Sequence, residues 1–192
     1  MKKFELTNEF ITNMFGTKLF RIRALVEFGD VEAGELGGYV EKESNLGHDD
    51  NAWVYDNAWV YGDAQVSGDA LVYDNARVYD NAWVYGDAQV SGDARVCGNA
   101  RVYGDARVCG NGDYAYAHGF GSVNRTTTFF RLKDGGVGVR CGCFYGTLAQ
   151  FRDKIRETHG ESAIAEEYLD LAALMEKRFR RTGNEQKTEE ES

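Results

Sequence analysis

The sequence contains no proline, only three histidines and no apolar stretch of the roughly 18 residues that a membrane-spanning helix needs. Residues 1–5 lack the hydrophobic core of a secretion signal. We therefore expect a protein of the bacterial cytoplasm that does not bind membranes. The lack of proline beside 23 glycines also suggests a repetitive chain.

Basic residues are in the minority, because 22 Lys and Arg face 31 Asp and Glu, for a formal net charge of −9. Such a chain repels phosphate backbones and anionic lipid surfaces, which argues against general nucleic-acid or membrane binding. The net charge does not argue against a local basic pocket that binds a small anion.

Cysteine is limited to four residues. Two of them, Cys141 and Cys143, are spaced too closely for the usual C-x-x-C metal or redox motif, and small core residues are the better interpretation. We expect reduced thiols, no metal and no cofactor. The four cysteines are Cys97, Cys109, Cys141 and Cys143.

From Asn51 the sequence repeats every six residues without a slip. A period of six fits neither a helix nor an alternating strand, and it is typical of a parallel β-helix. The ten successive hexads are NAWVYD, NAWVYG, DAQVSG, DALVYD, NARVYD, NAWVYG, DAQVSG, DARVCG, NARVYG and DARVCG.

The repeat predicts a three-sided prism in which each hexad contributes one short strand and one corner. Valine and alanine point inward, whereas Gly, Asn and Asp form the corners because they tolerate left-handed backbone angles. The same frame reaches Tyr114 and Phe120, which we expect to plug the prism. Residues 51–122 would then make four coils, about 19 Å tall at the usual strand spacing.

Residues that flank each valine point outward, so side chains 18 residues apart form vertical stripes on three faces. Clustered Trp, Tyr and Arg are typical of interfaces, and Trp59, Arg77 and Arg95 would stack as a cation–π ladder. An alternative is that these ladders only stabilise strand stacking. The interface candidates are Trp53, Trp59, Trp83, Tyr61 and Tyr85.

Before the repeat, we expect an N-terminal β cap over residues 1–50. Alternation over Lys18–Val26 predicts a half-buried strand, and Gly34–Tyr39 predicts a turn into the β-helix. Asn45 and Leu46 are a candidate degenerate hexad. The cap would cover the open edge of the first coil.

After the repeat, Asp134-Gly135 predicts a hairpin between strands 126–132 and 137–144. Thr147 and Gln150 form a capping box that opens a helix ending near His159. Ser162 would begin a second helix. We expect a C-terminal hairpin and two-helix domain over 123–181, and a disordered acidic tail over 182–192.

Three stretches of the chain resemble a family of bacteriophage and prophage proteins with central hexapeptide repeats, often labelled acetyltransferase-like. They are 19–41, the Asn-Ala-x-Val-Tyr-Gly array, and 127–148. The resemblance implies a left-handed β-helix in a mainly β fold, commonly trimeric, and a phage origin. It brings no catalytic residues, because a fold does not define an activity.

The preferred hypothesis is a non-catalytic, oligomeric binding protein, with a trimer favoured. It would act in counter-defence by sequestering a nucleotide immune signal or by binding a host protein. Arginine and aromatic side chains suit phosphates and bases. The ligand-binding candidates are Arg77, Arg95, Arg101, Arg125, Arg131, Arg140, Trp59 and Tyr79.

Two alternatives remain: a hexapeptide acyltransferase that uses acetyl-CoA, and a structural trimerisation module. An acyltransferase of this fold usually has a loop excursion and a histidine base. Here the ten hexads run uninterrupted and contain no histidine, since His48, His118 and His159 all lie outside them.

Overall fold

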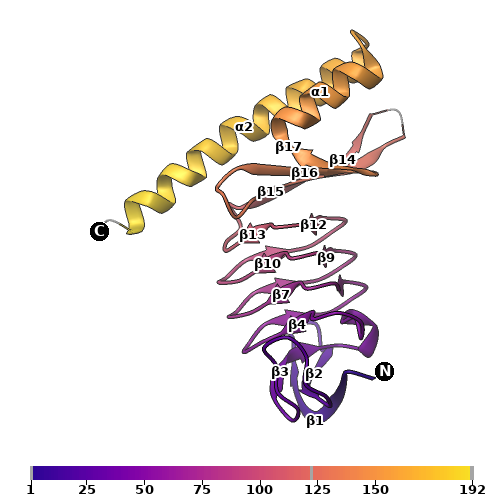
Figure 1. Cartoon of the computed structure of the whole chain (residues 1–192), viewed down its shortest axis with the longest axis vertical. Coiled ribbons are helices and arrows are strands. Elements are labelled where there is room, and N and C mark those ends of the chain that lie inside the picture. Colours follow the sequence, from indigo (N-terminus) through magenta and orange to yellow (C-terminus); the bar gives the residue numbers. More distant parts are fainter. Residues whose placement is uncertain (1, 122, 191–192) are drawn as a thin grey trace. The chain divides into compact units, whose positions relative to one another are not determined.

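The structure is a computed structural model that describes residues 2–121 and 123–190, with side chains described as far as Thr182 (Figure 1). The chain divides into two compact units, Met1–Asn111 and Gly112–Ser192. Within the described residues, no helix is long and apolar enough to cross a membrane.

Three parallel sheets stack their strands along the first unit, and each sheet forms one face of a prism (Figure 1). Partner residues such as Trp59, Arg77 and Arg95 lie directly above one another, which confirms the predicted stripes and the parallel β-solenoid. Its left-handed sense stays a prediction. The first face is β4 (Trp53–Val54), β7 (Leu71–Val72), β10 (Gln89–Val90) and β13 (Arg107–Val108); the second is β3 (Leu36–Val40), β5 (Trp59–Val60), β8 (Arg77–Val78) and β11 (Arg95–Val96); the third is β6 (Gln65–Val66), β9 (Trp83–Tyr85) and β12 (Arg101–Tyr103).

The valine and alanine of all ten hexads are fully buried, so the interior is a dry column of small side chains. Main-chain hydrogen bonds tie each coil to the next, for example from Tyr55 N to Val72 O at 2.8 Å. At the corners, Asp74 has a φ of 59° and Gly86 one of 73°. These left-handed angles explain why the last residue of a hexad is Asp or Gly, whereas the Asn or Asp that opens the next hexad does not have a positive φ.

The solenoid starts before Asn51. Val40 and Leu46 are already six residues apart and lie below Val60 and Val66, and the 3-10 helix η1 (Glu43–Asn45) lies between them. The next inward valine, Val54, comes after eight residues instead of six, which hid this coil from a strict six-residue frame.

The predicted turn at Gly34–Tyr39 is therefore wrong, because Leu36–Val40 is strand β3. Its glycines serve close packing: a Cβ on Gly38 would lie 2.7 Å from Ala58 O. Glycine is needed there for space, since only a bare backbone fits against the neighbouring coil.

Lys3 compensates for the irregular corner that the two extra residues create. Its Nζ donates to the carbonyl oxygens of Asp50 at 3.1 Å and Ala52 at 2.9 Å, and it lies 4.5 Å from the ring centre of Phe28. Burial lowers the pKa of the Lys3 ammonium to about 8, although the carboxylates of Asp50 and Asp49 raise it. A buried cation here replaces hydrogen bonds that a regular coil would make.

The N-terminal cap consists of two antiparallel strands added to the second face, β1 (Phe4–Thr12) and β2 (Lys18–Ala24). Strand β2 was predicted and β1 was not. The pairing of β2 with β3 shifts register between Arg21 and Arg23, so Leu19 and Ile22 are both buried. Simple alternation over Lys18–Val26 is interrupted by this bulge.

Coiling ends at Val108, so the expectation that the six-residue frame continues through Tyr114 and Phe120 is wrong. Residues Tyr114–Phe120 form β14, which pairs antiparallel with β15 (Arg125–Arg131) in the second unit. The hexad motif stops at Gly110, and an alternating strand follows. The solenoid still has about four coils, because the coil lost at this end is replaced by the one that contains β3.

The second unit is a four-stranded antiparallel sheet, β14-β15-β16-β17, with β16 at Val137–Cys141 and β17 at Phe144–Thr147. The hairpin at Gly135, with a φ of 82°, is confirmed. So is the capping box, where Thr147 Oγ1 accepts from Gln150 N and Gln150 Oε1 accepts from Thr147 N.

Two helices pack on this sheet, α1 (Leu148–His159) and α2 (Ala163–Glu190). Gly160 ends α1 with a φ of 58°, and Ser162 caps α2 through a bond from Ala165 N. The tail at 182–192, predicted to be disordered, is helical to Glu190, while 191–192 lie outside the described residues. Glu, Gln and Lys favour helix there once α2 has begun.

We predict that Val84→Thr destabilises the first unit by about 1–3 kcal/mol, because a hydroxyl enters the dry column without a partner. Gln65→Thr, on the outer side of the same sheet, should change stability by less than about 0.5 kcal/mol. All three tryptophans lie in Met1–Asn111, so tryptophan fluorescence during urea unfolding measures this unit. Equal losses of stability for Val84→Thr and Gln65→Thr would contradict the conclusion that Val84 points into the prism and Gln65 points outward.

We also predict a pH effect from Lys3. Its folded pKa lies near 8 and its ordinary value is 10.5, so between these values the unfolded chain holds more protons. The free energy of unfolding should therefore rise with pH across this range. Lys3→Met should remove this part of the rise, whereas Lys2→Met, a change at an exposed neighbour, should retain it. Urea unfolding followed by fluorescence at successive pH values measures both.

Candidate functional site

The second face carries an arginine directly over an aromatic ring. The guanidinium of Arg77 lies 4.1 Å from the ring centre of Trp59, and Tyr61 and Tyr79 stack at 5.1 Å with an interplanar angle of 4°. A hydrogen bond to Cys97, and then burial, raises the pKa of the Tyr79 phenol to about 12. These side chains stabilise one another along the stripe, as the alternative interpretation of the ladders expects.

The third face repeats the arrangement with greater exposure. Arg101 lies 5.2 Å from the ring centre of Trp83, and Tyr85 and Tyr103 are 4.4 Å apart. Trp83 is 41% exposed, which is unusual for an indole in a regular stack of strands. Residues 113–115 and 119–121, which contain Tyr114 and Phe120 and would extend these two faces by one more coil, lie in the second unit instead.

Trp53 is wrong as an interface candidate. It is fully buried inside its own chain, where Phe4 and Phe28 meet its indole edge-on at 6.2 and 5.3 Å. The N-terminal cap covers this part of the first face, so no partner reaches it. The six-residue repeat alone does not indicate that the N-terminal cap buries Trp53.

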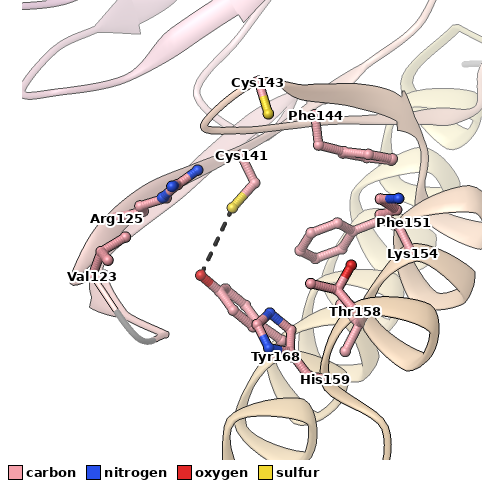
Figure 2. Close-up of a pocket in the computed structure, with 11 residues that line it drawn as sticks. Val123, Arg125, Cys141, Cys143, Phe144, Phe151, Lys154, Thr158, His159 and Tyr168 are labelled. Carbon is pink, nitrogen blue, oxygen red and sulfur yellow. Dashed lines mark hydrogen bonds between the residues drawn. The ribbon is translucent and has the colours of Figure 1, made fainter.

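The second unit contains a pocket of about 300 Å³, which we call the C-terminal pocket (Figure 2). It opens where the start of β15 and the turn after β16 face α1 and the first turns of α2. The volume lies at the small end of the range for ligand sites. Its lining residues are Val123, Arg125, Cys141, Cys143, Phe144, Phe151, Lys154, Ile155, Thr158, His159 and Tyr168.

Basic side chains come into the C-terminal pocket from different elements. Arg125 comes from the start of β15, and Lys154 and His159 come from α1, as Figure 2 shows. Lys154 Nζ also donates to Glu157 Oε2 at 2.9 Å. In a chain with a net charge of −9, this brings two cationic side chains and a histidine to a pocket with apolar walls.

The inner wall is a short hydrogen-bonded series of polar groups. Thr127 Oγ1 donates to Cys141 Sγ at 3.2 Å, and Cys141 Sγ lies 3.9 Å from the Tyr168 hydroxyl. That hydroxyl also donates to Phe120 O at 3.3 Å. Burial, and next the Cys141 thiol, raises the pKa of Tyr168 to about 12, so the phenol remains protonated at neutral pH.

Of the three hairpin arginines proposed from the sequence, the structure brings only Arg125 to the C-terminal pocket. Arg131 Nη2 donates to Phe179 O at 2.8 Å and helps to hold α2 on the sheet. Arg140 Nη1 donates to Cys143 O at 3.1 Å within the β16–β17 turn. Strand alternation explains the position of Arg140, because Arg140 and Cys141 point to opposite sides of β16. Arg131 lies at the other end of β15 from Arg125.

Most pocket residues were missed at the sequence level, including Phe144, Phe151, Lys154 and Tyr168. His159 was interpreted as a helix-end residue, which it is, and it also lines the pocket. The glycine between Cys141 and Cys143 is explained by the structure: Gly142 has a φ of 58°, and a Cβ there would collide with the Arg125 guanidinium. The Cys-Gly-Cys turn therefore leaves room for the arginine.

The comparisons with known proteins reach only the solenoid. The family described as YdcK Beta solenoid repeat matches residues 64–77, 70–86, 76–92, 88–100 and 94–110. With the stacked parallel sheets, this match defines the chain as a β-solenoid repeat protein. No curated protein matches the chain. In the described residues, no cluster of His, Cys, Asp and Glu is arranged to hold a metal ion.

We predict that alkaline pH weakens the second unit through Tyr168. Because folding raises the pKa of this phenol from 10 to about 12, its stabilising contribution is complete below pH 10 and is lost as pH rises toward 12. Tyr168→Phe should reduce this loss of stability with rising pH. Both helices lie in this unit, so circular dichroism at 222 nm measures it. Tyr116→Phe, at the surface of β14, is the matched control and should resemble the unchanged protein.

Proposed function

We propose that the protein is a non-catalytic binding protein whose C-terminal pocket takes a small anion bearing a flat aromatic group, of which a nucleotide is the leading class. The observation that supports this most directly is the grouping of Arg125, Lys154 and His159 around a cavity walled by aromatic rings. The rest of the proposal follows from the chemistry of those groups.

The basic side chains suit the anionic part of such a ligand. Arginine presents a planar fork of N–H donors that matches phosphate oxygens in pairs, and lysine adds a compact positive charge. Glu157 already pairs with Lys154, so Arg125 is the principal anion contact. Gly142 leaves room for the Arg125 guanidinium, which a Cβ at that position would meet.

The apolar walls suit the flat part of the ligand. Phe144 and Phe151 lie 5.4 Å apart, and Phe151 meets Tyr168 nearly edge-on at 5.9 Å. Rings tilted in this way offer both faces and edges to a heterocycle. The limited volume favours a mononucleotide over a longer signal.

The binding interpretation is preferred over acyl transfer because the ten hexads from Asn51 to Gly110 have no loop excursion. His48 stacks on Phe4 at 4.5 Å, and His118 Nδ1 lies 2.8 Å from Thr126 Oγ1. These local contacts support structural roles for the two histidines. The resemblance to phage and prophage proteins suggests a setting in which the protein sequesters a nucleotide immune signal during infection.

Titration calorimetry with a panel of mononucleotides, cyclic nucleotides, ADP-ribose and acetyl-CoA tests the proposal. We predict binding of at least one nucleotide, and a loss of tenfold or more in affinity for Arg125→Gln, which is about 1.4 kcal/mol. Arg156→Gln is the matched control. It removes an exposed arginine of α1 that pairs with Asp153 at 3.2 Å, away from the pocket.

The two arginine variants separate the possible results. An equal effect of Arg125→Gln and Arg156→Gln would move the site out of the C-terminal pocket. No binding across the panel would overturn the proposal. Binding of acetyl-CoA alone, followed by turnover with an acceptor, would favour the acyltransferase.

A further inference from the structure

The turn between β16 and β17 brings two cysteines, Cys141 and Cys143, to the wall of the C-terminal pocket (Figure 2). Strand β16 ends at Cys141, which pairs with Phe144 at the start of β17, so Gly142 and Cys143 form the connecting turn. Cys141 is buried, whereas Cys143 is exposed. A reagent that enters the pocket from solvent therefore meets the Cys143 thiol first.

The Arg125 guanidinium lies against this turn. A Cβ on Gly142 would lie 3.0 Å from the central carbon of the guanidinium and would collide with its Nη1. The residue between the two cysteines thus has a cation beside it, next in the chain to the exposed thiol. An anionic group that pairs with Arg125 is held close to Cys143, and such proximity favours a reaction between the two.

The two thiols differ in what surrounds them. Cys141 Sγ accepts from Thr127 Oγ1 at 3.2 Å and lies 3.9 Å from the Tyr168 hydroxyl, on the inner wall of the pocket. These contacts keep the Cys141 sulfur away from solvent. Exchange with a disulfide requires that the attacking sulfur can be reached, so exposure favours Cys143.

The C-terminal pocket has room for a small group attached at its wall. Its volume is about 300 Å³, and Lys154 and His159 line it together with Arg125. Lys154 is paired with Glu157, so Arg125 is the main cation for a carboxylate. A small disulfide that carries carboxylates, such as oxidised glutathione, combines a reactive S–S bond with the charge that Arg125 attracts.

We propose that Cys143 is a covalent modification site, where a small anionic disulfide leaves one half of itself on the protein as a mixed disulfide. The Cys143 thiol gives its proton to solvent, and its sulfur attacks one sulfur of the disulfide. A new S–S bond forms as the original one breaks, and the other half leaves as a thiolate that takes a proton from water. The disulfide is itself the oxidant, and the released thiol is the reduced product.

Intact-mass spectrometry of the reduced full chain with oxidised glutathione tests the attachment. We expect a first adduct of one glutathione, which peptide mapping should place at Cys143. Cys109 is the internal comparison, because it is also exposed but lies in the first unit. Cys143→Ser should abolish the first adduct, and Cys109→Ser should retain it. The readout involves no nucleotide, so it is separate from the test of the proposed function.

A neutral reagent, 2-hydroxyethyl disulfide, separates the effect of charge from that of exposure. The rate at Cys143 relative to Cys109 should be about fivefold higher with oxidised glutathione than with the neutral disulfide. Arg125→Gln should remove this excess. Arg156→Gln, at an exposed arginine of α1, is the matched control and should retain it. Circular dichroism on each variant shows whether the fold is kept.

Three results would overturn the proposal. The first is initial attachment at Cys97 or Cys109. The second is the same relative rate at Cys143 with the anionic and the neutral disulfide, or an excess that survives Arg125→Gln. The third is conversion of the adduct into a disulfide between Cys141 and Cys143, because the captured group would then be released.

Discussion

Every feature of the first unit depends on the inward column of valine and alanine. Because these side chains are small and fully buried, each side of the prism can be only one hexad long, and each coil must bond to the coil above. That geometry places residues 18 apart on one vertical line. It turns a one-dimensional repeat into stripes of arginine, aromatic rings and aspartate.

The same constraint explains the irregular start of the solenoid. A corner with two extra residues cannot make the standard coil-to-coil bonds, and Lys3 from outside the repeat provides the missing donors at Asp50 and Ala52. A buried ammonium group is unfavourable in itself, as its lowered pKa shows. The buried Lys3 ammonium group is retained because leaving the carbonyls of Asp50 and Ala52 buried without hydrogen bonds would cost more free energy.

The second unit follows a different principle. Its sheet is covered by two helices, and the C-terminal pocket forms where aromatic and basic side chains from α1 and the β15–β16 hairpin meet Tyr168 of α2. Such a site depends on how helices pack against strands, not on a repeat. The repeat and the pocket thus offer two kinds of surface, a periodic one on the solenoid and a concave one of the size of a small-ligand site.

Local and periodic signals in the sequence determined the β-solenoid, the vertical stripes, the Gly135 hairpin and the Thr147 capping box, because each depends on spacing or on contacts a few residues apart. The sequence could not show that Trp53 is buried by Phe4 and Phe28, that Val40 and Leu46 open the stack, or that Tyr114 belongs to another sheet. It also left Arg125, Lys154 and Tyr168 unconnected. Those relations join residues far apart in the chain, and only tertiary packing, which chooses among many possible long-range contacts, decided them.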